Sequence, residues 1–187
     1  MITVVTGFPR SGTSMMMKCL ECAGVHIFSN PSRDLQMQRH VTAGYNPNPH
    51  GYFEVLQSEF MSVGFTDRLE GGMAVKLPLQ QALALGTRHA AQIIIMHRDP
   101  AEIRESNKRA WPSIPFDKLY PTWPASSFNI MNAVRSVLLD RKTVKNIFDI
   151  DFSAVHADPR AALGGLPFDI EKLALGVDRE LYRNKAA

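Results

Sequence analysis

The sequence lacks any apolar run of about 18 residues or more, the length that a membrane-spanning helix needs, so we expect no membrane span. It also lacks a basic segment and a cleavage site near the N-terminus, where Ile2 already begins an apolar stretch. Both absences argue against a secretory leader and predict a cytoplasmic protein. Hydrophobic residues make up 45% of the 187 residues and charged residues 21%, which predicts one globular domain spanning residues 1–187.

Cysteine is scarce, and its two copies are poorly placed for redox or zinc chemistry. Cys19 and Cys22 have CxxC spacing, but a redox pair needs its first thiol at a helix N-terminus, where the helix dipole lowers the thiol pKa. Both cysteines instead fall late in a predicted helix. Zinc binds four ligands, of which this motif offers two. We therefore interpret both thiols as helix-packing side chains.

Clustered positive charge is also lacking. The net charge is +3 and the pI is near 9.0, which suits an anionic ligand. Lysine and arginine are nevertheless scattered along the chain, so we expect no nucleic-acid-binding surface.

Short apolar runs alternate with helical patterns along the chain, which predicts an α/β fold. Asp99 is expected to cap a helix that has Pro100 in its first turn and Glu102 at the third position. The proline-rich segments 29–52 and 111–124 are predicted to be mostly loop. The alternation predicts three layers, a central and mostly parallel sheet with helices on both faces. We expect strands over 2–6, 73–77, 92–97 and 147–152, and helices over 13–23, 57–69, 80–85, 127–145, 158–163 and 169–175.

The first predicted strand leads into a glycine-bounded loop, Gly7-Phe8-Pro9-Arg10-Ser11-Gly12-Thr13-Ser14, with the G-x-x-x-x-G frame of a phosphate-binding loop. Its glycines let backbone amides turn toward an anion, and the helix that follows adds its positive end. Nucleoside triphosphatases place a lysine after the second glycine. This chain has Thr13 there and supplies its cation from within the loop, as Arg10, whose guanidinium can bind a phosphate through two nitrogens.

The chain also lacks an acidic residue at the end of its second strongly apolar strand, where a magnesium site would need one. That strand ends at His97 and Arg98, and Asp99 is assigned to the helix cap. We therefore expect hydroxyls, amides and arginine to hold the anion without a metal, which points away from kinases.

Two motifs far apart in the sequence carry the strongest functional signal. One is PRSGTS, residues 9–14, and the other is Arg98-Asp99-Pro100 with Ser106 eight residues after the arginine. Together they resemble the P-loop sulfotransferase superfamily, whose loop has the form P-[KR]-S-G-T-[ST]. The segments NPHGYFE, residues 48–54, and DRELYRNK, residues 178–185, look like those of its small bacterial members.

The resemblance implies a donor, 3′-phosphoadenosine 5′-phosphosulfate (PAPS), and a metal-free reaction. Arg98 and Ser106 would hold its 3′-phosphate. The sulfuryl group would pass to a hydroxyl or amine of a small-molecule, carbohydrate or lipid-like acceptor, which releases adenosine 3′,5′-bisphosphate. We expect the loops 29–52 and 111–124 to line the acceptor site. The residues implied for the 5′-side of the donor are Pro9, Arg10, Ser11, Gly12, Thr13 and Ser14.

The match departs from the family at the residue that accepts the proton. Many members have a lysine at a strand end and a catalytic histidine two residues later. This chain has Lys76 at the strand end but Pro78 in the histidine position. Arg10 and Lys76 can stabilise the charge that grows on the leaving phosphate. Glu54 is the candidate general base, because some branches use a glutamate, and His50 is the alternative.

Two other functions stay open. A non-catalytic nucleotide-binding or regulatory protein on the same fold would bind the cofactor without transferring sulfate, as the missing histidine suggests. A small-molecule P-loop kinase would bind ATP with magnesium, but it needs a lysine where Thr13 stands.

Overall fold

The structure, a computed structural model, describes residues 1–32, 34–35, 48–55, 57–62, 64–84, 90–112, 115–116 and 125–178. Its centre is a five-stranded sheet in the order β2-β3-β1-β4-β5, and all neighbouring strands are parallel. The strands are β1 (Ile2–Gly7), β2 (His26–Phe28), β3 (Met73–Lys76), β4 (Ala91–His97) and β5 (Val144–Asp151).

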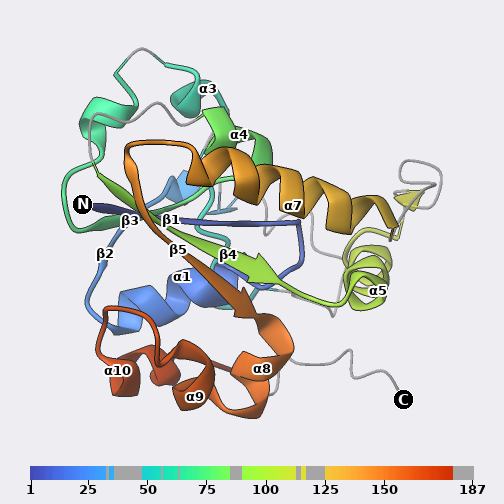
Figure 1. Cartoon of the computed structure of the whole chain (residues 1–187). Helices are drawn as coiled ribbons and strands as arrows, with labels where there is room; N and C mark the ends of the chain where they lie inside the picture. Colours follow the sequence, from blue (N-terminus) through green and yellow to red (C-terminus); the bar gives the residue numbers. More distant parts are fainter. Residues whose placement is uncertain are drawn as a thin grey trace.

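Helices cover both faces of the sheet (Figure 1). One face packs against α1 (Thr13–Cys22), α8 (Phe152–Ala157), α9 (Pro159–Leu163) and α10 (Ile170–Leu175). The other packs against α4 (Leu79–Ala84) and α7 (Ala125–Leu139). Further helical segments among the described residues include α3 (Gln57–Phe60), the 3-10 turn η1 (Thr66–Arg68) and α5 (Pro100–Ala110). The α/β class, the parallel sheet and the helices on both faces are confirmed.

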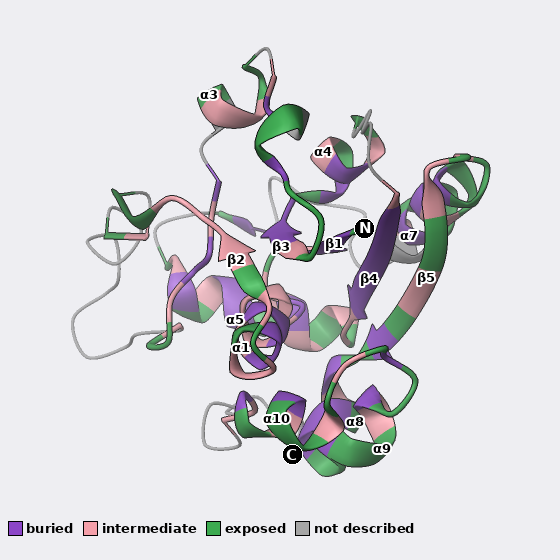
Figure 2. Cartoon of the chain, turned by 90° about the vertical axis from the view of Figure 1, so that its left-hand side faces the viewer, coloured by how far each residue is buried: buried purple, intermediate pink, exposed green. Residues whose placement is uncertain are grey.

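The hydrophobic core is divided by the sheet into two clusters. We call them the α7-side cluster and the α1-side cluster. Alternate residues of β4 enter each, with Ile93 and Ile95 in the first and Ile94 and Met96 in the second. Every residue from Ala91 to Met96 is buried, so β4 is coloured as buried over nearly its whole length in Figure 2. Its apolar run over residues 93–96 is the pattern of a central strand covered on both faces.

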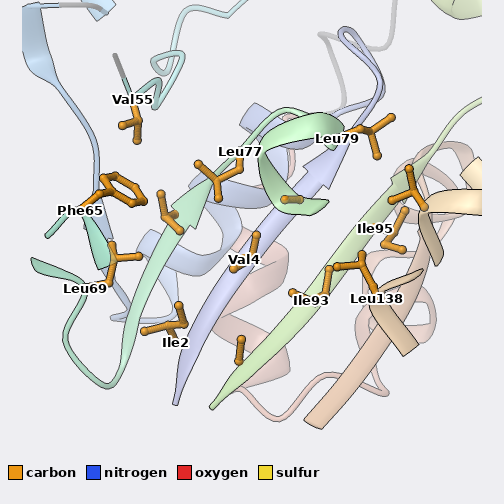
Figure 3. Packing of buried hydrophobic residues seen from close by; sticks show 14 of the residues in the cluster. Ile2, Val4, Val55, Phe65, Leu69, Leu77, Leu79, Ile93, Ile95 and Leu138 are labelled. Atoms are coloured by element: carbon orange, nitrogen blue, oxygen red, sulfur yellow. The ribbon is translucent and has the colours of Figure 1, made fainter. Parts of the chain in front are cut away.

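Figure 3 shows the α7-side cluster, where Val4, Ile93 and Ile95 from neighbouring strands lie together with Leu79 of α4 and Leu138 of α7. Burial of these aliphatic side chains stabilises the contact between sheet and helices by about 25 cal/mol per Å² of apolar surface. Within the described residues, no helix combines the length and the apolar character that a bilayer crossing would require.

The structure corrects several predicted boundaries. The helix predicted over 127–145 was too long, because α7 ends at Leu139 and β5 already begins at Val144. The helix predicted over 57–69 was wrong: α3 and η1 are separate turns, and Gly64 between them has φ +80°. Residues 31–32 and 34–35 are helical within a segment predicted to be mostly loop. The strand β2 and the helix α8 were not predicted.

The packing interpretation of the cysteines is confirmed for Cys19. Its side chain is fully buried in the α1-side cluster. Burial, with a smaller contribution from the nearby Cys22 thiol, raises the pKa of the Cys19 thiol to about 12. A thiol that stays protonated at neutral pH is a poor nucleophile and a poor metal ligand.

Candidate functional site

The loop between β1 and α1 is a tight turn pressed against neighbouring elements. Gly7 has φ +156° and Gly12 has φ +100°. A Cβ on Gly7 would lie 2.7 Å from the Met96 carbonyl oxygen, and one on Gly12 would lie 2.3 Å from Cδ2 of Phe152. Only glycine fits such approaches without displacing its neighbours. The loop therefore sits against the carboxyl end of β4, the edge where parallel sheets bind ligands.

Ser11 is the buried polar residue of this loop. It is 1% exposed, and its Oγ has no hydrogen-bond partner among the described residues. A buried hydroxyl without a partner costs about 1–3 kcal/mol. The Ser11 hydroxyl is therefore suited to bond a ligand in the loop. Of the other predicted loop residues, Pro9 is exposed and Thr13 is the first residue of α1.

Arg10 joins the two motifs that are far apart in the sequence. Its Nε donates a hydrogen bond to Ser106 Oγ at 3.1 Å, and its carbonyl oxygen accepts one from Arg98 Nη1 at 3.0 Å. Its guanidinium also lies over the Trp111 ring, 5.8 Å from the centroid. Ser106 is only 1% exposed, so its hydroxyl faces Arg10 rather than solvent. Trp111 begins the loop 111–124 that was expected to line the acceptor site, and its contact with Arg10 was not predicted.

Besides the Arg10 carbonyl oxygen, Arg98 contacts two further side chains. Its Nε donates to Glu102 at 2.9 Å, with side chains 6% and 12% exposed. Its guanidinium carbon lies 4.2 Å from the centroid of the Phe152 ring, within cation–π range. Sequence reasoning missed both partners, because Glu102 was assigned to the helix cap and Phe152 to a strand end. The cap itself is confirmed, since Asp99 accepts from the amides of Ala101 and Glu102.

Beside the loop, a buried Lys76 forms an ion pair with a partly exposed Glu54. Lys76 Nζ donates to Glu54 Oε1 at 2.6 Å and to Ser14 Oγ at 3.1 Å, and the Lys76 side chain is 8% exposed. The Tyr52 carbonyl oxygen also accepts from Lys76 and from Ser14. Burial lowers the pKa of the Lys76 ammonium, and the Glu54 carboxylate opposes that shift. The ammonium therefore faces the first turn of α1.

Glu54 and His50 lie in the same segment but in different surroundings. The Glu54 side chain is 27% exposed. His50 Nε2 lies 3.0 Å from Asp178 Oδ2, and the His50 side chain is 46% exposed. Of the two candidate bases, the structure brings Glu54 to Lys76 and links His50 instead to the segment after α10.

Parts of the predicted site lie outside the described residues: residues 33, 36–47, 113–114 and 117–124 of the loops expected at the acceptor, and residues 179–185 of the tail. Within the described ranges, no group of three or more histidine, cysteine, aspartate or glutamate side chains is placed to hold a metal ion. A scan against models of protein families finds no match for this chain, and a search of curated proteins finds none either.

Proposed function

We propose that this chain is a sulfotransferase-like protein that binds PAPS and transfers its sulfuryl group, without a metal, to a hydroxyl or amine acceptor. One observation carries the proposal: Arg10 of the loop contacts both Ser106 and Arg98. A glycine loop at a helix N-terminus suits one anionic group, and a guanidinium with a neighbouring hydroxyl suits a second. A ligand with separate anionic groups on its 5′ and 3′ sides would occupy both of these arrangements.

The remaining residues fit the transfer step. The bond between sulfur and the 5′-phosphate oxygen breaks, a bond from sulfur to the acceptor forms, and the acceptor loses a proton. The charge left on the phosphate needs nearby cations, which Arg10 and Lys76 supply. Lys76 lies 3.1 Å from Ser14, at the start of the helix that follows the loop. Glu54, at 2.6 Å from Lys76, is the carboxylate nearest to that cation and takes the proton in our proposal.

A non-catalytic nucleotide-binding protein is the second candidate, and one observation favours it. Oε1 of Glu54 already accepts a charge-assisted hydrogen bond from Lys76, so this oxygen is engaged by a cation and not by an acceptor hydroxyl. Such a protein would bind adenosine 3′,5′-bisphosphate equally well but would release none from PAPS with any acceptor.

The first experiment compares ligands by thermal denaturation. We expect adenosine 3′,5′-bisphosphate to raise the Tm, because a ligand that binds only the folded state stabilises it. Adenosine 5′-monophosphate, which lacks the 3′-phosphate, should raise it less. Stabilisation by ATP with magnesium but not by the bisphosphate would favour the kinase alternative and overturn the proposal.

The matched variants are Arg98→Lys and Arg160→Lys, measured by calorimetry. Lysine keeps the charge but not the paired nitrogens of arginine. We expect R98K to weaken bisphosphate binding by about tenfold and to affect adenosine 5′-monophosphate little. Arg160 forms an exposed ion pair with Glu171 on α9 and α10, so R160K should bind like the wild type. Bisphosphate affinity that is unchanged in R98K would remove the 3′-phosphate assignment.

A further inference from the structure

Asp34 lies outside every motif described above, yet its carboxylate holds the segment that contacts Lys76. Its Oδ2 accepts from the Phe53 amide at 3.0 Å, and its Oδ1 accepts from the Glu54 amide at 3.1 Å. Both carboxylate oxygens are thus used on two consecutive backbone amides. Hydrogen bonds to an ionised acceptor are stronger than those between neutral groups.

The Phe53 backbone needs such support. Its φ is +55°, a left-handed conformation that costs a residue with a side chain about 1–2 kcal/mol. The Phe53 ring is 6% exposed and packs in the α1-side cluster, which fixes the direction of the side chain. The residue after Phe53 is held as well, because the Asn30 amide donates to the Glu54 carbonyl oxygen at 2.8 Å. Asn30 is in turn linked to Asp34, whose amide donates to the Asn30 carbonyl oxygen at 3.1 Å. Asn30 and Asp34 therefore hold this segment through the Phe53 amide, the Glu54 amide and the Glu54 carbonyl oxygen.

The φ angle of Phe53 decides which groups reach Lys76. The Tyr52 carbonyl belongs to the peptide group between Tyr52 and Phe53. Rotation about φ of Phe53 turns this peptide group relative to the following chain, which carries Glu54. At the observed angle both the Tyr52 carbonyl and the Glu54 carboxylate accept from the same ammonium. An extended Phe53 would turn one of these acceptors away from Lys76.

We propose that Asp34 is a positioning residue, which holds Phe53 in its left-handed conformation and thereby keeps the Tyr52 carbonyl and the Glu54 carboxylate on Lys76. Its importance for transfer rests on the proposed function. Four effects act on the pKa of the Lys76 ammonium: burial lowers it, Glu54 raises it, Asp34 raises it less, and Arg10 lowers it. Glu54 held in place therefore opposes the lowering of the Lys76 pKa by burial.

The test follows the Lys76 Cε signal by NMR during a pH titration of the ligand-free protein, with the signal assigned from Lys76→Arg. We expect the titration midpoint of Lys76 to shift downward in Asp34→Ala. The control is Asp158→Ala, which also removes an aspartate that accepts from two backbone amides, those of Arg160 and Ala161. Asp158 is an exposed helix cap on α9, so D158A should leave the Lys76 midpoint where it is.

A double-mutant cycle with Glu54→Gln separates positioning from the charge of Asp34 itself. If Asp34 acts through Glu54, D34A shifts the midpoint less in the E54Q background than in the wild type. An equal shift in both backgrounds, or no shift in D34A, would overturn the proposal. Asp34→Asn keeps one acceptor oxygen, so it should give an intermediate shift, and it carries the same test if D34A does not fold.

The titration contains no nucleotide, so its outcome is independent of the ligand proposed for the loop. If adenosine 3′,5′-bisphosphate fails to bind while D34A shifts the Lys76 midpoint, the proposed function is wrong and the positioning role stands. If PAPS is the donor, D34N should lower kcat of acceptor-dependent release and leave the KM for PAPS nearly unchanged. If D34N instead lowers the Tm and the affinity for PAPS together with kcat, the role of Asp34 is merely structural.

Discussion

At the residue scale, Gly12 is where the loop meets the helices that follow β5. Its φ of +100° and the closeness of the Phe152 ring both exclude a side chain. The same ring lies under the guanidinium of Arg98. One aromatic side chain therefore contacts both the loop and the arginine of the second motif, so a change at Gly12 disturbs both motifs at once.

We predict that Gly12→Ala lowers the free energy of unfolding by at least about 3 kcal/mol, from left-handed strain plus overpacking. Gly24→Ala is the matched control, because Gly24 has φ +84° but nothing within 4 Å of a new Cβ. It should lose only about 1 kcal/mol, the strain alone. Urea denaturation measures both. The loss in G12A should shrink in a Phe152→Ala background, and an equal loss in both backgrounds would contradict the assigned clash.

At the scale of elements, α5 follows the end of β4 and carries the buried Ser106. Its start is set by Asp99, which accepts from two amides of the first turn, and by Pro100 at the first position. Glu102 in that turn pairs with Arg98. The sequence predicted this helix start correctly because capping is local chemistry, readable from consecutive residues.

We predict that Asp99→Ala lowers the free energy of unfolding by about 1 kcal/mol, the usual loss for a helix N-cap. Asp99→Asn keeps a side-chain oxygen that accepts from the same amides, so it should stay near the wild type. Urea denaturation monitored by circular dichroism distinguishes the two variants. A loss in D99N as large as that in D99A would mean that the charge of Asp99, rather than its cap, stabilises α5.

Elements defined by pairing or by turns were harder to predict. The strand β2 has only three residues, His26–Phe28, and forms because it pairs with β3. Residues 140–143 between α7 and β5 are polar, but Val144 follows Val137 by seven residues, a helical spacing, so hydrophobic periodicity extended the predicted helix too far. Both errors concern contacts between segments distant in the chain, which no local pattern contains.

At the scale of the whole molecule, the sheet separates two hydrophobic clusters, and β4 contributes residues to both. Leu138 of α7 belongs to one cluster and Leu173 of α10 to the other, and they are 1% and 0% exposed. Because β4 contributes alternate residues to both, we expect the two sides to unfold together.

We predict that Leu138→Ala and Leu173→Ala each lower the free energy of unfolding by about 2–5 kcal/mol. Their effects should add within about 0.5 kcal/mol, since the two side chains share no partners. Chemical denaturation followed by fluorescence and by circular dichroism should give one coincident transition. Two separated transitions in either single variant would contradict a common cooperative unit.

The sequence by itself determined the α/β class, the glycine-bounded loop, the start of α5 and the two motifs, because periodicity, glycine placement and capping are local properties of the chain. Only the tertiary structure decided which distant side chains meet: Arg10 with Ser106, Glu54 with Lys76, and Phe152 with Gly12. It also revealed Asp34, whose role depends on the backbone angle of Phe53. Such contacts follow from strand order and from the burial of side chains on both faces of the sheet, which the linear pattern does not specify.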